Sequence, residues 1–411
     1  MAEGRNFTLY NMEDGFAEAF LRGLRSTFLT DLDYTNLKEG GQRGGGDKDG
    51  KTQEDFEDLR LSLQETDFGN FLAAEPALDP KIIASRTTDK WVKEFKYIRC
   101  TVSGPLGRFL DFVSYEYMID NILDLVKAAT SSSNVDMKAV IDNCHPLGLL
   151  EPSVMKSILA FEDLGEDFHA LYRTILVDTP VGKYFTQFLQ ETLDDKAAMD
   201  PTSVKSTFNE LPMTLIENSV KKFYLEDFYY YCKENLGGET GVVMGELLAA
   251  RADMLTINIT YNSLTTDFSR SKGRSTAGGG GASSREALFP SFGNLYPEGA
   301  KMLAKVEDED SLRRALAKSC PGYAQLWDQA PVDARGVRDV SDAFFRHAVH
   351  MLELAFEGQF HYSPFYAFAK LKEQESKNIS WIATCLEHGV YSEMDRIIPI
   401  FSKNSSKGLR K

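Results

Sequence analysis

The sequence of 411 residues predicts an all-α protein, and two observations indicate this fold class. Apolar residues return every three or four positions through most of the chain, which is the repeat of one helix face. Alternating runs bounded by turns, which would indicate strands, are few, and only the short segment 257–261 is ambiguous. The 27 Phe and 17 Tyr supply ample bulk for helical cores.

The predicted helices can be followed in chain order. The clearest segments are 16–28, 106–123, 223–231, 247–259 and 365–385. The first repeats Phe or Leu at intervals of four, and the second is apolar nearly all round, so we expect it to be buried on most sides. The third contains six aromatic residues in nine positions, and the fourth mixes Leu, Ala and Met with isolated charges.

Segment 365–385 is the most informative of these helices. An apolar stripe is formed by Phe365, Phe368, Leu371, Ile379 and Ile382, and the side chains expected on the solvent side are Lys370, Lys372, Glu373 and Lys377. Glu373 and Lys377 have the favourable order of an i,i+4 ion pair. Glu375 and Asn378 lie closer to the apolar side. If they are buried, they need polar partners, because an unpaired buried carboxylate is costly.

A weak internal repeat suggests about three similar helical modules. Segment 63–72 resembles 175–185, and each module has a long helix with polar residues inside an apolar face. These polar residues are Asp120 with Asn121, Asp253 with Asn258, and Glu375 with Asn378. The predicted parts are modules 1–135, 136–270 and 286–401, a Gly-rich insert 38–51, a Gly/Ser-rich insert 271–285, and a polar tail 402–411.

The composition excludes some classes of function. The formal charge of −15 argues against nucleic-acid binding and against broad adhesion to an anionic membrane, because both need a basic face. Five dispersed cysteines without a CxxC pair fit a reducing compartment. No secretory signal and no apolar run long enough to span a bilayer is visible, so we expect a cytosolic protein.

One literal motif offers an enzymatic alternative. Residues 45–52 match GxxxxGK[ST], the pattern of a phosphate-binding loop. Such a loop needs a buried strand before it and a helix after it, whereas Leu37 to Gly44 is polar and Gly-rich. Asp47 and Asp49 within the loop would also repel phosphate. A nucleotide-binding protein that uses residues 45–52 is therefore the second hypothesis.

Two other groups of residues could support chemistry. His347, His350 and Glu353 share part of one helix face, with Glu357 and His361 further on, and these side chains could bind zinc. Because no HExxH-type base accompanies them, we interpret this face as solvated. Cys144 is followed directly by His145, and neighbouring side chains on regular backbone point apart. We interpret residues 144–148 as a turn, because Pro146 and Gly148 favour one.

Taken together, the chain resembles a known family. The matching segments are 15–24, 33–37, 63–72, 110–112, 117–121, 144–148, 175–180, 288–290, 295–299, 359–361, 365–385 and 398–401. In these stretches it is similar to the d subunits of V-type proton-translocating ATPases, which are related to the C subunits of archaeal A-type ATPases. Members mostly lack the two Gly-rich inserts and tend to end near Phe401, so the apparent phosphate loop lies inside an insert.

The resemblance implies a fold, a function and a set of partners. It implies a funnel of three helical modules that couples the rotating central stalk, subunits D and F, to the proteolipid c-ring and the a subunit of the membrane sector. It implies a peripheral position on the cytosolic face of vacuolar or endosomal membranes. It also implies no catalytic residue, no metal and no cofactor. We expect Asp120, Asn121, Glu375 and Asn378 to act as structural polar pairs that stiffen the modules.

Overall fold

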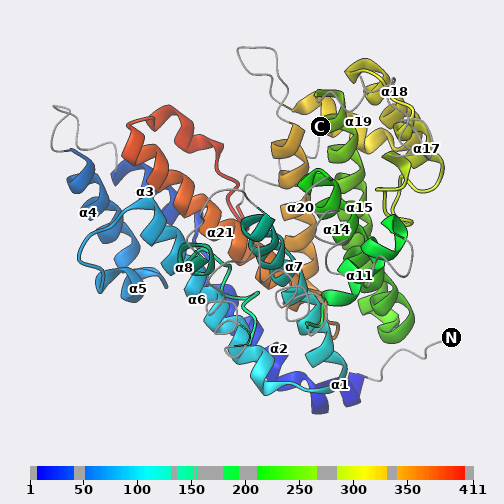
Figure 1. The fold of residues 1–411 in the computed structure, drawn as a ribbon. Coiled ribbons are helices and arrows are strands. Elements are labelled where there is room, and N and C mark those ends of the chain that lie inside the picture. Colours follow the sequence, from blue (N-terminus) through cyan, green and yellow to red (C-terminus); the bar gives the residue numbers. More distant parts are fainter. Residues whose placement is uncertain are drawn as a thin grey trace. The chain divides into compact units, whose positions relative to one another are not determined.

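The computed structural model describes residues 7–40, 51–130, 137–151, 154, 179–193, 211–265, 285–330 and 340–402. Within these ranges the regular elements are helices and no strand is present, which confirms the all-α class (Figure 1). Residues 41–50, 271–284 and 403–411, which form most of the predicted inserts and tail, lie outside the described residues. None of the described helices is long and apolar enough to cross a membrane.

The helices gather into two compact units. We call Glu3–Leu110 with Arg346–Lys411 the terminal unit, and Asp111–Phe345 the central unit. The division between them falls within helices α7 and α20. This division does not test the three modules proposed from the sequence, which remain a prediction.

The terminal unit combines both ends of the chain. Its elements are α1 (Phe7–Glu13), α2 (Gly15–Gly23), η1 (Leu24–Thr27), α3 (Asp31–Gly40), α4 (Lys51–Gln64), α5 (Gly69–Ala73), α6 (Pro80–Thr101), the start of α7 (Gly104–Thr130), the end of α20 (Val340–Glu357), α21 (Ser363–His388) and η5 (Tyr391–Arg396). The C-terminal α21 packs along α6 and α4, so segments far apart in sequence lie side by side (Figure 1).

Local signals in the sequence fix the start of α6 and the end of α21. Asp79 caps α6 by accepting a hydrogen bond from the Ile82 amide at 2.7 Å, and Pro80 follows in the first turn. Helix α21 ends at Gly389, whose φ of 66° is left-handed and therefore suits glycine. The core between these helices includes Leu37, Leu59, Leu63, Phe68, Leu72, Ile83, Ile379, Ile382 and Leu386.

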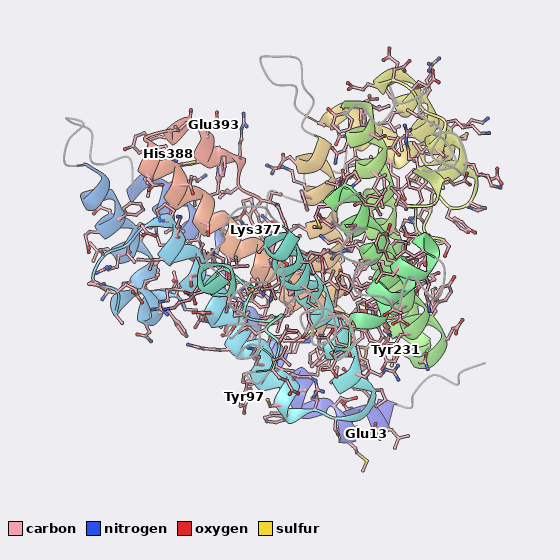
Figure 2. All side chains as sticks on the ribbon, viewed as in Figure 1. Glu13, Tyr97, Tyr231, Lys377, His388 and Glu393 are labelled. Carbon is pink, nitrogen blue, oxygen red and sulfur yellow. The ribbon has the colours of Figure 1, made fainter. Side chains whose placement is uncertain are left out.

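The central unit is built in the same way from long helices. Besides parts of α7 and α20, it contains α8 (Met137–Asp142), α11 (Gly182–Thr192), α14 (Met213–Tyr230), the π-helix η3 (Tyr231–Leu236), α15 (Gly238–Thr265), α17 (Glu298–Ala304), α18 (Glu309–Ser319) and α19 (Pro321–Gln329). One of its cores includes Ile257, Leu295, Leu303, Leu312, Leu316, Trp327 and Phe344. In both units the side chains fill the space between the helices (Figure 2).

Most of the predicted helices are present. Segments 106–123, 247–259 and 365–385 lie in α7, α15 and α21, and the ambiguous segment 257–261 is helical. The first segment differs from a single helix, because α2 ends at Gly23 and the chain continues as a 3-10 helix. Its apolar positions therefore do not share one buried face: Phe28 is buried, whereas Phe16 is 64% exposed.

Candidate functional site: buried polar anchors

The clearest polar site of the terminal unit is centred on Asn378 of α21, which is 2% exposed. Its amide nitrogen donates to the Ile398 carbonyl at 2.7 Å and to the Tyr34 hydroxyl at 3.1 Å. Its amide oxygen accepts from the Ile398 backbone N–H at 3.1 Å and from the Gln374 side chain at 3.0 Å. We call such a residue an anchor: a buried helix side chain that bonds the backbone of a later segment containing proline, here Pro399.

A second anchor lies in the central unit on α7. Asn121 is 4% exposed, donates to the His145 carbonyl at 3.0 Å and accepts from the His145 backbone N–H at 2.7 Å. The His145 ring stacks on Tyr117 with the ring centres 4.3 Å apart. The turn ends at Gly148, which lies against the backbone of Tyr117. A Cβ atom at position 148 would be only 2.3 Å from that backbone, so only glycine fits. The predicted turn at 144–148 is thus confirmed, and its hydrogen bonds come from Asn121.

The third anchor is Asp253 of α15, which is 1% exposed. One carboxylate oxygen accepts from the Leu295 N–H at 2.9 Å. The other accepts from the Asn294 N–H at 2.9 Å, the Asn294 side chain at 3.0 Å and the Tyr323 hydroxyl at 2.8 Å. Burial raises the pKa of Asp253, and these hydrogen bonds oppose that shift. Gly293, with a φ of 122°, lets the loop approach this carboxylate, because a Cβ there would lie 2.5 Å from it.

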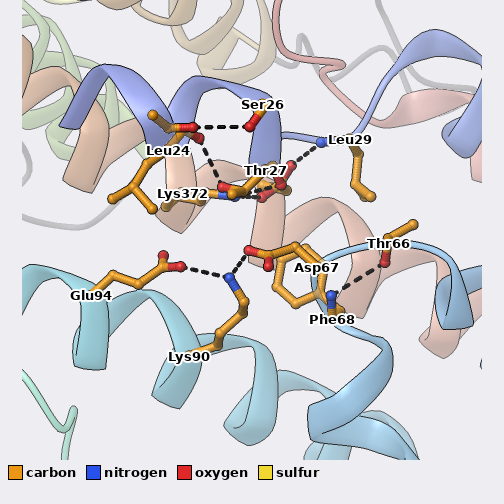
Figure 3. Close-up of polar contacts among 12 residues, drawn as sticks. Leu24, Ser26, Thr27, Leu29, Thr66, Asp67, Phe68, Lys90, Glu94 and Lys372 are labelled. Carbon is orange, nitrogen blue, oxygen red and sulfur yellow. Dashed lines mark hydrogen bonds and ion pairs between the residues drawn. The ribbon is translucent and has the colours of Figure 1, made fainter. Parts of the chain in front are cut away.

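Next to Asn378, α21 also contains a buried ion pair. Lys372 and Glu375 are 1% and 0% exposed, and their charged atoms are 2.7 Å apart. Glu375 accepts from the Leu29 N–H at 2.6 Å, and Lys372 donates to the Thr27 carbonyl at 2.9 Å (Figure 3). The ammonium also lies 4.2 Å from the centre of the Phe28 ring. This pair therefore holds the connection between η1 and α3 against α21.

A second buried lysine lies close to this connection. Lys90 of α6 pairs with Asp67 and, at 2.7 Å, with Glu94 (Figure 3). Burial lowers the pKa of Lys90, while Glu94 opposes that effect. Both Lys90 and Lys372 lie over the Phe68 ring, at 5.6 and 5.5 Å from its centre. The polar cluster thus joins α6, α21 and the segments around η1 and α5.

The geometry corrects one expectation from the sequence and refines another. Lys372 was expected on the solvent side, but it is buried because Glu375, the Thr27 carbonyl and an aromatic ring replace its hydration. Among the described contacts, Glu375 and Asn378 bond to separate partners rather than to each other. The expected pair of Glu373 and Lys377 is confirmed at 2.7 Å.

Asp120 and Asn121 also serve different partners. Asp120 is half-exposed and pairs with Lys221 of α14 at 2.9 Å, while Asn121 faces inward to its turn. Burial lowers the pKa of Lys221, but Asp120 and Glu217 outweigh it and raise that pKa overall. Adjacent residues on α7 therefore tie it to α14 and to the following turn.

The histidine-bearing face of α20 is not solvated throughout, contrary to expectation. Glu353 is 7% exposed and accepts a hydrogen bond from the Phe401 backbone N–H, while His350 lies 3.6 Å from Glu353. Burial raises the pKa of Glu353 and lowers that of His347. In the described part of the chain, no three His, Cys, Asp or Glu side chains are grouped so that they could hold a metal ion.

Comparison with known proteins decides the family. The model of the ATP synthase (C/AC39) subunit family matches residues 17–396. The chain belongs to this family. It is 36% identical over 394 residues to the V-type proton ATPase subunit d of Dictyostelium discoideum, covering 95% of this chain and 96% of the relative. It is 33% identical over 395 residues to V-type proton ATPase subunit d1 of Arabidopsis thaliana, covering 95% and 98%. The resemblance seen in the sequence is thus confirmed.

The helices on either side of residues 45–50 bear on the phosphate-loop alternative. Residues 45–50 lie outside the described residues, and Lys51 and Thr52 begin helix α4. The residues described before this segment form helix α3, which ends at Gly40, and not the strand that a phosphate loop requires. The local architecture therefore argues against nucleotide binding by residues 45–52.

Proposed function

We propose that this chain is a non-catalytic coupling subunit of a V-type proton ATPase. Its role is to link the rotating central stalk to the proteolipid c-ring, so that ATP hydrolysis elsewhere in the complex drives proton translocation. The single observation that carries the proposal is the similarity, over 95% of this chain, to proteins named V-type proton ATPase subunit d. No other function is favoured by a specific contact in the described residues.

The proposal extends to partners and location. We expect contacts with the c-ring and the a subunit of the membrane sector and with central-stalk subunits D and F. The complex would hold the chain on the cytosolic face of a vacuolar or endosomal membrane. The lack of a membrane-crossing helix among the described residues is compatible with peripheral attachment.

The anchors give this role a physical basis. A coupling element must resist deformation, and close-packed helices with satisfied polar networks are stiff. Asn121, Asp253 and Asn378 each fasten a proline-containing segment to a long helix. Their recurrence on α7, α15 and α21, one long helix in each proposed module, supports three modules. Asn121 and Asp253 each bond the beginning of the following module, and Asn378 bonds a segment of its own module. The ion pair of Lys372 and Glu375 adds a further cross-connection in the terminal unit.

Chemical cross-linking in native membranes tests the assembly. We expect cross-links from this chain to the c-ring and to central-stalk subunits. Recovery of neither group would overturn the proposal. ATP-driven acidification of the same membranes, compared with their ATPase rate, then tests coupling. Loss of this chain should abolish acidification.

Deletion of residues 41–51 separates the coupling role from the phosphate-loop alternative. A coupling subunit should keep assembly and acidification, because this segment is a Gly-rich insert without large apolar residues. A nucleotide-dependent protein should lose its function. Loss of acidification with assembly intact would therefore support the alternative.

A further inference from the structure

The segment that follows η5 is bound by side chains rather than by regular secondary structure. We call this segment, Ile397–Phe401, the strap. Among the described residues, its backbone N–H and C=O groups bond to side chains and to no other backbone group. At its start, for example, Arg346 of α20 donates to the Ile397 carbonyl at 3.3 Å. Because neither a helix nor a sheet ladder continues through it, the strap is held as a bound peptide is held.

Two buried side chains of the long helices bond the backbone of the strap. Asn378 of α21 accepts from the Ile398 N–H at 3.1 Å and donates to the Ile398 carbonyl at 2.7 Å. A residue before proline favours extended backbone, which presents its N–H and C=O on the same side, so one amide can serve both groups. Glu353 of α20 accepts from the Phe401 N–H. Both ends of the strap are therefore fixed through its main chain.

The side chains of the strap are also bound. Ile400 is 2% exposed. The Phe401 ring centre lies 5.4 Å from that of Phe28 and 5.7 Å from that of Phe356. The guanidinium carbon of Arg25 lies 3.5 Å from the centre of the same ring, which is a cation–π contact. The terminal unit thus supplies apolar, aromatic and cationic contacts to one short sequence.

The strap is bound in a strained conformation. Phe401 has a φ of 56°, in the left-handed region that a bulky aromatic side chain rarely adopts. Such a conformation persists only where surrounding contacts impose it, and here these are the bond to Glu353 and the ring contacts. Release of the strap would relieve this strain without breaking a hydrogen bond of any helix.

We propose that the terminal unit contains a peptide-binding site and that the strap is its built-in, releasable ligand. We call this the strap site, and it is formed by Arg25, Phe28, Glu353, Phe356 and Asn378. Its ligand class is an extended segment in which a branched aliphatic residue and proline precede an aromatic residue. The bound strap ties η1, α20 and α21 together, and its departure removes this shared contact while the helices stay folded. The inference goes beyond the coupling role and does not depend on it.

A full-length chain with a disabled strap tests the site. Replacing Ile400 and Phe401 together with Asp removes the apolar contacts of the strap and leaves every side chain of the strap site in place. A labelled synthetic peptide with the sequence of residues 395–402 should bind this double variant, as measured by fluorescence anisotropy. It should bind the wild-type chain at least about a hundredfold more weakly, because the tethered strap competes at an effective concentration of millimolar order.

Changes within the strap site should weaken this binding specifically. In the double-variant background, Asn378→Ala should reduce the peptide affinity at least about tenfold, because two backbone groups of the peptide lose their partner. Lys377→Ala is the matched control, because this neighbouring side chain on α21 is 61% exposed and pairs with Glu373. It should leave the affinity unchanged. Helical circular dichroism checks that each variant is folded.

Hydrogen exchange of the wild-type chain provides a test that needs no variant. The Ile398 and Phe401 amides should exchange at least about tenfold faster than the buried amides of α21, because the strap opens while the helix stays folded. Equal exchange in both would show that the strap opens only on global unfolding, which would overturn the proposal. The proposal would also be overturned if the folded double variant failed to bind the peptide, or if the wild-type chain bound it equally well.

Discussion

Two buried carboxylates, one in each unit, are held in different ways. Asp253 of the central unit accepts hydrogen bonds from neutral N–H and O–H groups of Asn294, Leu295 and Tyr323. Glu375 of the terminal unit pairs with the cation of Lys372 and accepts one further bond from the Leu29 N–H. Both side chains are almost inaccessible to solvent, at 1% and 0% exposed.

Because their partners differ, the two carboxylates satisfy different buried groups. Removing the charge of Asp253 would leave neutral donors short of an acceptor, which costs a moderate amount. Removing the charge of Glu375 would leave a buried ammonium without its counter-ion, which costs more. Neutralising a buried carboxylate on an apolar helix face therefore costs a different amount of free energy in the two units. The cost depends on whether its partners are neutral donors or a cation.

The largest expected effect is that of Glu375→Gln. The amide keeps the shape of the side chain but leaves Lys372 buried and uncompensated, so the free energy of unfolding should fall by about 3–5 kcal/mol. Urea unfolding followed by tryptophan fluorescence measures this loss. In native membranes, the same variant should weaken assembly or ATP-driven acidification. If assembly and coupled pumping were unchanged, the ion pair would have no mechanical role.

Two further variants show whether charge is the cause. The double variant Lys372→Met with Glu375→Gln removes both charges and should recover much of the lost stability. Lys377→Ala breaks the exposed pair with Glu373 and should change the unfolding free energy by less than about 1 kcal/mol. A double variant less stable than Glu375→Gln would contradict the argument.

The second effect concerns the neutral anchor, Asn378→Asp. A carboxylate can still accept from the Ile398 N–H, but its other oxygen would face the Ile398 carbonyl, which now receives a hydrogen bond at 2.7 Å. We expect a loss of about 3 kcal/mol at neutral pH. Acidification should restore part of it, because a protonated carboxyl can donate to that carbonyl. Urea unfolding at two pH values checks both points.

The third effect, Asp253→Asn, should be smaller. The Asn294 and Leu295 backbone N–H groups bond to different carboxylate oxygens, so one amide oxygen can serve only one of them. The variant should lose about 1–2 kcal/mol. Hydrogen exchange should increase in residues 289–297 and stay unchanged in residues 397–401. An equal increase of exchange in both segments would show that the effect of Asp253 is not local.

Much of this arrangement was predictable from the sequence, and a definable part was not. The spacing of apolar residues predicted α21, and the inward position of Asn378 was visible as a polar residue near an apolar stripe. The burial of Lys372 was not visible. It depends on the Thr27 carbonyl and on Phe28, about 345 positions away in the chain, and helical periodicity does not report such contacts. The same limit hid Lys90, which meets Asp67 only through folding.

The smallest effect is a difference in the response of the units to acid. Burial lowers the pKa of His347 in the terminal unit below its ordinary value of 6.5, with a further contribution from His350. The folded chain therefore favours the neutral imidazole, and its stability should fall as the pH drops through and below about 6.5. His347→Gln should reduce the loss between pH 8 and pH 5.5, measured by urea unfolding, whereas His388→Gln, at an exposed position, should not. Trp91 and Trp381 lie in the terminal unit and Trp327 in the central unit, so versions that keep only Trp91 or only Trp327 can show which unit responds. An equal response of both units would remove His347 as the cause.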